Sequence, residues 1–595
     1  MTQTRAIGRN LIFAGLLCTL GLGATSFAAE ADKGFTIGSH NVAVADPAVP
    51  RPAGKPCVVV LFRDATFANF NPRPYSYEPP KGCGYGSHNS GNTSWAKVVL
   101  EADFSVTAGR QYDRTASLWL GGVNLYFGTT QEPSSTVAPS WHVERDLTDY
   151  SAFLRAGRKG QAVIGNVVNA TYTGVIHGSA RLLFYPSTGH NSVPTADAVY
   201  PLGADPIGST TTLNSSTDKL AKTLTLPRNV ERVFLDVFAQ SQGNDEFWYT
   251  CVPDQYASEV NECGGGNFRE AEISIDGQPA GIAPIYPWIY TGGIDPFLWE
   301  PTPGVQTLNF MPYRVDLTPF AGLLSNGASH EVAVSVAGAN NSFSATAALL
   351  VYRDKQRKQV TGQITRNTLV GQAATPTIGS TLTNDGKGNI NGDITTELTR
   401  QFIIEGYADT SRGRVYTLVN HAVTFDNTQS FVIDASTYRQ TTQQLTTSNS
   451  TSARRIGNQQ LGQSREHVDY PLYVDYNQQA ATDGSSTAAT NVLLNYNQTT
   501  GLDDANGKTL YEANVHNDVT AGDTLAFDKN GNYTGHSGQN SNQSFDFGDS
   551  LGSCYQTNVT SANGALSAFS AGQGCPNGQN HVLWFAHPDG SPYTL

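Results

Sequence analysis

Two segments in the first half of this 595-residue chain follow the same order of elements, and this repeat narrows the folds open to it. Residues 146–150 read Asp-Leu-Thr-Asp-Tyr, residues 316–320 read Asp-Leu-Thr-Pro-Phe, and an apolar run ending in tyrosine follows each. Upstream, the strand-like run 114–122 corresponds to 269–277 in the same order. The repeat predicts two β-domains of one architecture in tandem.

Short runs in which apolar and polar residues alternate support a β-structure for both repeats. Examples are 98–106, 233–238 and 332–336, where the period of two is that of a strand with one buried face. The chain contains 59 glycines and only 15% charged residues, a composition typical of an all-β protein rich in turns. Because little helix is predicted, each repeat is expected to be a β-sandwich or jelly roll.

The predicted organisation is all-β, with two tandem jelly-roll or β-sandwich domains followed by a polar β-rich C-terminal region. The expected parts are a signal peptide at 1–28, a first sandwich at 29–208, a second sandwich at 209–354 and the C-terminal region at 355–595. The boundary between the sandwiches is placed at 209–219, a Thr/Ser/Asn stretch without periodicity. In the C-terminal region, 441–455 lacks apolar anchors and is expected to be a mobile loop.

The first 28 residues are typical of a secretory signal peptide. Arg5 and Arg9 precede an apolar run, and small residues at Ser26 and Ala28 suit signal peptidase. No later stretch is long and apolar enough to cross a membrane, so no membrane insertion is expected. We expect a secreted or periplasmic protein.

Six cysteines follow the predicted signal peptide and lie in three close pairs along the sequence. The pairs are Cys57 with Cys83, Cys251 with Cys263, and Cys554 with Cys575. Their number alone leaves the connectivity open, but the close spacing and an oxidising compartment favour three local disulfides. No spacing typical of a zinc site occurs, so neither a metal nor a cofactor is predicted. The formal charge of -13, with scattered acidic residues, argues against nucleic acid as a partner.

Several acidic residues lie where a catalytic or sugar-binding group is placed in β-proteins. Asp113 and Arg114 are adjacent at the start of a predicted strand, where a base with an oriented partner and a structural ion pair fit equally well. Glu132 follows the strand that contains Trp119 and faces either a cleft or water. The run 244–249 combines acids and aromatic rings, which bind the hydroxyls and C–H faces of sugars, although a solvated loop fits it equally well.

A serine hydrolase is a competing interpretation, because residues 548–552 match the Gly-x-Ser-x-Gly pattern of a nucleophile elbow. That motif requires a helix directly after the serine, whereas turn residues and Cys554 follow here. We therefore expect this match to be a turn.

A family resemblance runs from about Cys57 to Tyr352. The motifs that carry it are Gly-Arg-Gln-Tyr-Asp-Arg at 109–114, Trp-Leu-Gly-Gly-Val at 119–123, Glu-Pro at 132–133, Trp141 with 143–146, 291–296 with 298–299, and 316–320. In this order they resemble peptide-N-glycosidase A, the plant-type glycoamidase with acidic bacterial relatives. The resemblance implies hydrolysis of the amide between Asn and the innermost N-acetylglucosamine of an N-glycan, which gives Asp and a glycosylamine, without a metal and at acidic pH.

The resemblance also assigns roles to residues. Tyr-Asp-Arg at 112–114 is similar to the aromatic-Asp-Arg motif at the base site of N-glycosidase F, which pairs two jelly rolls, so Asp113 is the expected general base. Glu132 and Glu246 are the expected second carboxylates. The expected sugar contacts are Arg114, Trp141, Asp245, Trp248 and Arg269.

N-glycopeptides or N-glycoproteins are the implied substrates, and a monomer is expected. A secreted carbohydrate-binding protein or adhesin that lost hydrolysis is the alternative from another class. A glycosidase is a third interpretation, and it would cleave between sugars and leave N-acetylglucosamine on Asn.

Overall fold

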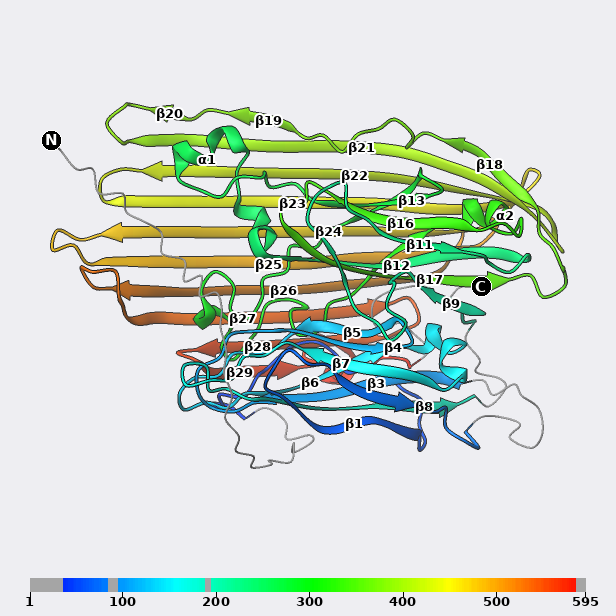
Figure 1. Ribbon diagram of the computed structural model, residues 1–595, viewed down its shortest axis with the longest axis horizontal. Coiled ribbons are helices and arrows are strands. Elements are labelled where there is room, and N and C mark those ends of the chain that lie inside the picture. The colour runs from blue at the N-terminus through cyan, green and yellow to red at the C-terminus, as the bar shows by residue number, and fades with distance from the viewer. Residues whose placement is uncertain (1–35, 84–94, 188–193, 585–595) are drawn as a thin grey trace.

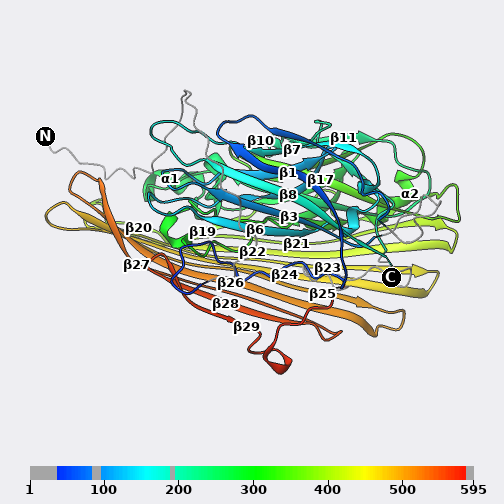
Figure 2. The same cartoon turned by 90° about the horizontal axis from the view of Figure 1, so that it is seen from below.

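The computed structural model describes residues 36–83, 95–187 and 194–584. The signal peptide predicted at 1–28 lies outside these residues. The described chain is built almost entirely of strands, which confirms the all-β prediction. Two β-sandwiches lie on one face of a single large sheet formed by the last part of the chain (Figures 1 and 2).

The first sandwich consists of two four-stranded antiparallel sheets. One has the order β1(Cys57–Phe67), β8(Ile176–Pro186), β3(Trp95–Val106), β6(Ser140–Asp146), and the other the order β2(Arg73–Tyr77), β7(Arg158–Ile164), β4(Thr115–Leu120), β5(Val123–Thr129). Leu100 and Leu182 from the first sheet share a buried core with Leu118 from the second. The two sheets therefore face each other, as expected of a sandwich, while the jelly-roll form stays a prediction.

The second sandwich repeats this plan. Its sheets have the orders β10(Thr211–Leu213), β17(Ser342–Arg353), β12(Val230–Gln242), β15(Tyr313–Asp316) and β11(Leu220–Leu224), β16(His330–Ala337), β13(Glu270–Ile275), β14(Gln278–Pro284). A further strand, β9(Ala198–Pro201), pairs with β17. β9 lies before the expected boundary at 208/209 and β10 lies inside the expected linker at 209–219, yet both pair with β17 of the second sandwich.

The repeated Asp-Leu-Thr motif forms the same short element in both sandwiches. Oδ1 of Asp146 accepts the N–H of Thr148 at 3.0 Å, and Oδ1 of Asp316 accepts the N–H of Thr318 at 2.8 Å. A 3-10 helix follows each motif, namely η1(Thr148–Tyr150) before η2(Phe153–Arg155), and η6(Thr318–Phe320) before the short helix α2(Ala321–Leu324). The tandem repeat inferred from sequence is therefore present.

The C-terminal region forms one twelve-stranded antiparallel sheet. Its strands are β18(Gly362–Asn367), β19(Thr377–Ser380), β20(Thr383–Asn384), β21(Ile390–Thr410), β22(Gly413–Ile433), β23(Thr437–Ile456), β24(Gln459–Ala480), β25(Ser486–Asp503), β26(Thr509–Phe527), β27(Tyr533–Asp549), β28(Cys554–Ala562) and β29(Ala565–Ala571). Apolar residues alternate along the long strands, and those such as Phe402, Val423 and Val492 join the core of the second sandwich. One face of the sheet is thereby fixed to the sandwich.

The expectation of a mobile loop at 441–455 is wrong, because these residues lie within β23 and pair with β22 and β24 along the strand. Polar side chains occupy its inward positions, and the amide of Gln440 donates to the carbonyl oxygen of Thr250 at 2.7 Å. From the neighbouring strand β22, Gln429 donates to the carbonyl oxygen of Cys251 at 2.8 Å. Hydrogen bonds to a loop of the second sandwich thus replace apolar contacts.

The remaining short helices lie in loops. They are η3(Gly243–Asp245), η4(Trp248–Thr250), α1(Asp254–Val260), η5(Pro296–Trp299) and η7(Pro576–Gly578). Disulfides join Cys57 to Cys83, Cys251 to Cys263 and Cys554 to Cys575, which confirms the three local pairs. Among the described residues, no helix has the length and apolar character needed to cross a membrane.

Candidate active site

Asp113 and Glu132 meet because of the pairing of β4 with β5. The two strands are antiparallel, and Thr115 pairs with Thr129, so the residues just before β4 and just after β5 emerge at the same edge of the sheet. There the backbone N–H of Asp113 donates to Oε1 of Glu132 at 3.0 Å. Both side chains are half-buried. Two residues 19 positions apart therefore form one acidic pair.

The second sandwich contributes Gly292, which lies against both carboxyl groups. Its backbone N–H donates to Oδ2 of Asp113 at 3.2 Å. A β-carbon added at Gly292 would lie 2.4 Å from Oε1 of Glu132 and 2.9 Å from Oδ1 of Asp113, closer than atoms in contact allow. Only glycine fits here without displacing the acidic pair.

The loop that holds Gly292 is tied to the first sandwich on both sides. Before it, the hydroxyl of Thr291 donates to the carbonyl oxygen of Thr130 at 2.5 Å. After it, the amide of Gln131 donates to the carbonyl oxygen of Trp299 at 2.7 Å, and the indole of Trp299 donates to the carbonyl oxygen of Gly293 at 2.9 Å. The acidic pair thus lies at the interface of the two sandwiches.

Glu246 is the third carboxyl group at this interface and also comes from the second sandwich. It ends η3 in the loop after β12 and is half-buried. Burial and the nearby charge of Asp113 raise the pKa of Glu246 to about 7. Asp113 and Glu132 therefore form a contact, and Glu246, from a third loop, lies within range of the charge of Asp113.

The charges of Asp113 and Glu132 influence each other, and their surroundings affect the two pKa values differently. Burial raises the pKa of Asp113, but the N–H of Gly292 and the charge of Arg114 favour its anion. Burial, together with the charges of Asp113 and Glu300, raises the pKa of Glu132 well above its usual range. Both pKa values are therefore raised, and that of Glu132 more strongly, so Glu132 is the member of the pair that binds a proton more tightly.

Arg114 lies beside the acidic pair, with Tyr112 of the same motif and Tyr172, neither of which was among the predicted sugar contacts. Its Nη2 donates to Oε1 of Gln111 at 2.7 Å, and its guanidinium lies 6.0 Å from the centre of the Tyr112 ring. The rings of Tyr112 and Tyr172 lie 5.4 Å apart and are both half-buried. Their accessible faces are suited to the C–H face of a sugar.

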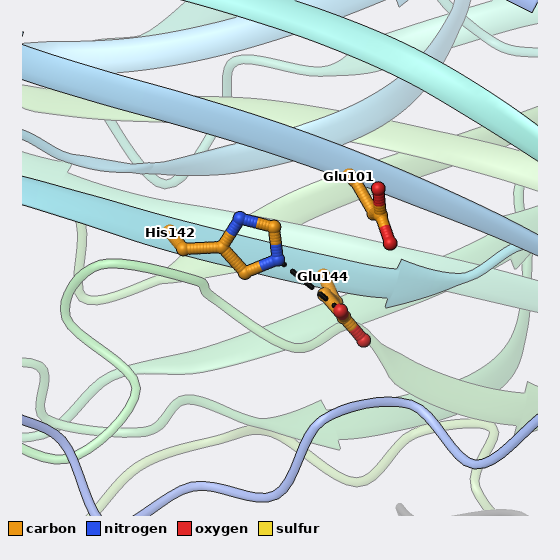
Figure 3. A group of neighbouring side chains, drawn as sticks. All are labelled: Glu101, His142 and Glu144. Carbon is orange, nitrogen blue, oxygen red and sulfur yellow. Dashed lines mark hydrogen bonds and ion pairs between the residues drawn. The ribbon is translucent and has the colours of Figure 1, made fainter. Parts of the chain in front are cut away.

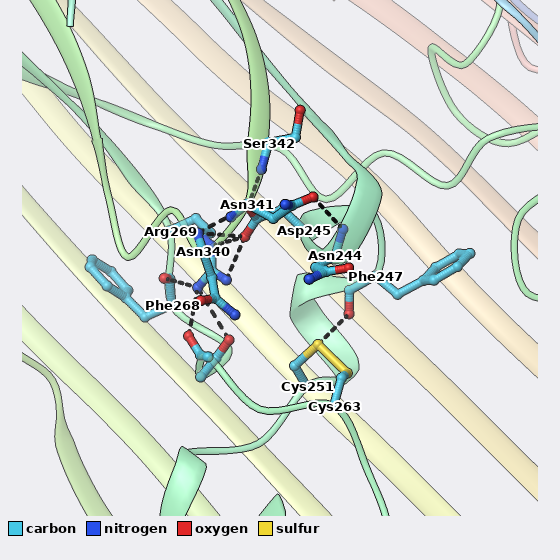
Figure 4. A network of polar contacts seen from close by, with 12 residues as sticks. Asn244, Asp245, Phe247, Cys251, Cys263, Phe268, Arg269, Asn340, Asn341 and Ser342 are labelled. Carbon is cyan, nitrogen blue, oxygen red and sulfur yellow. Dashed lines mark hydrogen bonds and ion pairs between the residues drawn. A yellow bond between two sulfur atoms is a disulfide. The ribbon is translucent and has the colours of Figure 1, made fainter. Parts of the chain in front are cut away.

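Asp245 and Arg269, expected to contact sugar, are instead enclosed by protein (Figure 4). The side chains are 0% and 1% exposed, and Nη2 of Arg269 lies 2.7 Å from Oδ1 of Asp245. The carboxylate of Asp245 also accepts backbone N–H groups from Asn341 at 2.8 Å and Ser342 at 2.9 Å. Because these contacts are with other protein groups, the two residues hold the loop next to Glu246 in place. Their burial contradicts the predicted contact with sugar.

The two tryptophans expected at sugar are also buried. Trp248 is 1% exposed and belongs to the core of the second sandwich, close to the disulfide between Cys251 and Cys263. Trp141 is 6% exposed, stacks on Phe104 and lines a cavity of about 1530 Å³ that both sandwiches and the C-terminal sheet border. None of the three catalytic candidates lines that cavity. Large apolar rings are drawn into cores, which a local motif does not reveal.

Glu101, His142 and Glu144 lie close enough together to resemble a set of metal ligands (Figure 3). Arginines already act as the cations in this cluster. Nη1 of Arg51 lies 2.7 Å from Glu101, its Nη2 contacts Glu144, and Nε of Arg181 lies 2.5 Å from Glu101. The group is therefore an ion-pair cluster that joins the N-terminal segment to the first sandwich.

The serine of the Gly-x-Ser-x-Gly match lies in the turn between β27 and β28. Its Oγ accepts the backbone N–H of Glu512 at 3.1 Å, and no helix follows among the described residues before Cys554. The turn predicted for this segment is confirmed.

Comparison with known proteins gives one family. The sequence profile described as peptide N-acetyl-β-D-glucosaminyl asparaginase amidase A matches residues 47–369. Peptide-N4-(N-acetyl-β-glucosaminyl)asparagine amidase A of Prunus dulcis is 28% identical over 468 residues, which cover 75% of this chain and 78% of that protein.

Two solved structures are also similar to part of the chain. PNGase F, a glycosylasparaginase from Flavobacterium meningosepticum, is 13% identical with a TM-score of 0.33, over 50% of this chain and 96% of that one. The structure of PNGF-II is 12% identical with a TM-score of 0.33, over 50% of this chain and 65% of that one.

Proposed function

The chain belongs to the peptide N-acetyl-β-D-glucosaminyl asparaginase amidase A family, and on that premise we propose that Asp113, Glu132 and Glu246 form its hydrolytic site. The enzyme is a peptide-N4-(N-acetyl-β-glucosaminyl)asparagine amidase. It hydrolyses the amide between Asn and the innermost N-acetylglucosamine of an N-glycan, which gives Asp and a glycosylamine. The observation that supports the proposed site is that Asp113 and Glu132 of the first sandwich meet at Gly292 of the second, with Glu246 within range of the charge of Asp113.

Asp113 acts as the general base in the proposed reaction. Amide hydrolysis requires a group that removes a proton from water as the water attacks the amide carbon. Burial raises the pKa of Asp113, and the N–H of Gly292 and the charge of Arg114 oppose that effect because they favour its anion. We assign this anion to the role of base.

Glu132 acts as the general acid. Its raised pKa keeps a proton beside Asp113, and transfer of that proton to the departing nitrogen completes cleavage of the amide bond. Glu246, with a pKa of about 7, is also protonated in acid and donates a hydrogen bond to the substrate. Activity should fall as the pH rises and these two groups lose their protons, because both act as donors in the proposed reaction.

Sugar contact is assigned to Arg114, Tyr112 and Tyr172, which lie half-buried beside Asp113. Aromatic faces bind the C–H surface of a sugar ring, and a guanidinium donates to its hydroxyl groups. Glycopeptides or glycoproteins are the substrates we propose. Three disulfides fit an exported enzyme, and we propose a secreted or periplasmic location.

The test is mass spectrometry of an N-glycopeptide incubated with enzyme in heavy-oxygen water at about pH 5. The peptide is expected to return with Asp in place of the glycosylated Asn and with one heavy oxygen, and Asp113→Asn is expected to abolish this product. Asp504→Asn, in the turn between β25 and β26 at the opposite end of β26 from Asp523, is the matched control and should behave as the wild type.

Two other products would contradict the proposal. A peptide that retains N-acetylglucosamine on Asn would indicate a glycosidase. A glycopeptide that is bound but returned unchanged would favour the carbohydrate-binding alternative. Normal turnover by Asp113→Asn would remove Asp113 from the role of base.

A further inference from the structure

Two buried carboxyl groups from distant parts of the chain face each other behind the Gly292 loop. Asp295, 0% exposed, lies three residues after Gly292, and Asp523, 4% exposed, lies on β26 of the C-terminal sheet. The two groups lie close enough for Asp523, second to burial, to raise the pKa of Asp295, and the Oδ2 atom of each is buried without a hydrogen-bond partner among the described residues. The contact therefore links the proposed active-site loop directly to the C-terminal sheet.

The hydrogen bonds of Asp295 and Asp523 show which of their carboxyl oxygens lack a donor. Oδ1 of Asp295 accepts the N–H of Phe297 at 3.0 Å, and Oδ1 of Asp523 lies 3.1 Å from Nδ1 of His536. Oδ2 of each carboxyl group has no N–H or O–H donor from the described residues. Two carboxyl oxygens form a hydrogen bond only when one carries a proton, and two buried carboxylates without a donor repel each other. Burial, and after it the charge of Asp523, raises the pKa of Asp295 to about 7, in agreement with a retained proton.

The titratable groups around the pair come from three elements. Glu300, from the same loop, adds negative charge beside Asp295, while His536 and Tyr533 come from β27. His40, from the N-terminal segment, acts on Glu300. The ring of Phe297 stacks on His536 with centres 3.7 Å apart. The hairpin of β26 and β27 therefore covers η5 and encloses the pair.

The loop between the carboxyl pair and the acidic pair is short and well connected. The N–H of Asp295 donates to the carbonyl oxygen of Gly293 at 2.7 Å, and the N–H of Gly293 donates to the carbonyl oxygen of Tyr290 at 2.8 Å. The next residue back, Gly292, donates to Asp113. A displacement of Asp295 therefore moves the donor on which the anion of Asp113 depends.

We propose that Asp295 and Asp523 are positioning residues that share one proton, which holds the Gly292 loop against Asp113 in acidic solution and releases it when the proton is lost near neutral pH. The shared proton follows from the contacts of the pair alone. Its effect on catalysis rests on the function proposed above.

Hydrogen exchange of the full-length protein tests the shared proton without reference to catalysis. Amides of the segment 290–300 are compared at about pH 5 and about pH 8, after correction for the intrinsic exchange rate, with the turn 325–329, which has no titratable side chain, as the reference loop. In the wild type, protection of 290–300 is expected to fall at least about tenfold between these values, which corresponds to one unit of pKa. The reference loop should change much less.

Asp523→Asn supplies the decisive comparison. Its Oδ1 can keep the contact with His536 while its amide N–H donates to Asp295 at every pH, so protection of 290–300 should become independent of pH. In Asp295→Asn the new side-chain amide donates to Asp523 instead, and protection of 290–300 should again become independent of pH. Asp523→Ala provides no donor and should lose protection at both pH values.

Activity measured on the same variants separates positioning from stability alone. Both Asn variants should keep wild-type kcat/KM at about pH 5 and retain several-fold more activity than the wild type at about pH 8. If protection of 290–300 in the wild type does not change with pH, or the Asn variants lose protection as the wild type does, the shared proton is ruled out. If protection follows the prediction but activity does not, the role assigned to Gly292 fails while the shared proton stands.

Discussion

At the scale of single residues, Gly292 contributes to the site through the absence of a side chain. The carboxyl groups of Asp113 and Glu132 occupy the space that a β-carbon would need, and the backbone N–H next to them binds Asp113. The carboxyl groups supply the chemistry, whereas the glycine determines how closely they approach the opposite sandwich.

Gly292→Ala is expected to reduce kcat/KM at least about 100-fold, because a misplacement of about 1 Å at catalytic groups has an effect of this size. The backbone at Gly292 is not in the left-handed region, so alanine introduces no conformational strain and the melting temperature should change little. Gly203→Ala is the control, since its β-carbon would meet only an oxygen 3.5 Å away. Steady-state kinetics and thermal unfolding of both variants provide the measurement.

Glu132→Gln tests the assignment of acid and base. Removal of the proton donor should lower kcat by about 100- to 10,000-fold, with a smaller change in KM. The decline of the remaining activity toward neutral pH should become shallower, because one of the groups that must stay protonated is absent while Glu246 and the Asp295–Asp523 pair still titrate. A pH profile of kcat with an unchanged decline in this variant would assign the proton to another group, with Glu246 as the next candidate.

At the scale of elements, the loop between β12 and β13 shows how buried polar contacts position a catalytic side chain. Asp245 pairs with Arg269 in the interior, while Asn427 and Gln429 of β22 donate to backbone oxygens of Tyr249 and Cys251. Glu246 lies between these two sets of contacts. The C-terminal sheet therefore holds the second half of the proposed site in place.

Asp245→Asn leaves the charge of Arg269 buried without a partner. Loss of one member of a buried ion pair costs about 3–5 kcal/mol, so the free energy of unfolding in urea should fall by about this amount. Asp475→Asn, in the exposed pair with Arg439, should change it much less. Equal effects of the two variants would mean that the Asp245 pair does not hold the loop.

At the scale of the whole molecule, buried carboxyl groups connect stability to acidic conditions. In five of them burial is the main cause of a raised pKa. The pKa is raised to about 6 in Asp46 and to about 7 in Glu246, Glu270, Asp295 and Glu300. Because the folded protein binds these protons more tightly than the unfolded chain, the stabilisation is complete below about pH 4 and is lost as the pH rises toward 7.

Histidines modify this dependence. Burial lowers the pKa of His421 to about 4, so its contribution is present above about pH 6.5 and is lost as the pH falls. The pKa of His142 is raised to about 10; burial lowers it, but contacts with Asp103 and Glu144 outweigh that effect. The stabilisation from His142 therefore declines above about pH 6.5. This change has the same direction as the loss of stabilisation from the carboxyl groups as the pH rises.

The melting temperature is therefore expected to be several degrees higher at about pH 5 than at about pH 8. Scanning calorimetry at constant ionic strength across this range provides the measurement. Conversion of Glu270 to Gln should reduce the difference, because this removes one carboxyl group whose pKa is raised by burial. A protein that is more stable at about pH 8 would contradict the expected balance.

Much of the fold and part of the site could be predicted from local sequence. Strand periodicity, the repeated Asp-Leu-Thr motif and the spacing of the cysteines depend on neighbouring residues, and the all-β fold, the repeat and the three disulfides are confirmed. Asp113 and Glu132 were selected beside strand ends, where antiparallel pairing of β4 and β5 brings them together. The Gly-Gly run at 292–293 belonged to a motif that supported the family resemblance, and two adjacent glycines were the available signal of a close approach.

The sequence by itself determined which segments become strands, because alternation of apolar and polar residues depends on each strand alone. Only the tertiary structure decided which polar groups become buried. Arg114 and Arg269 occupy matching places in the two repeats, yet one lies half-buried beside Asp113 and the other is enclosed with Asp245. Their neighbours come from distant loops, and burial, which determines both access to substrate and pKa, depends on those neighbours rather than on the motif.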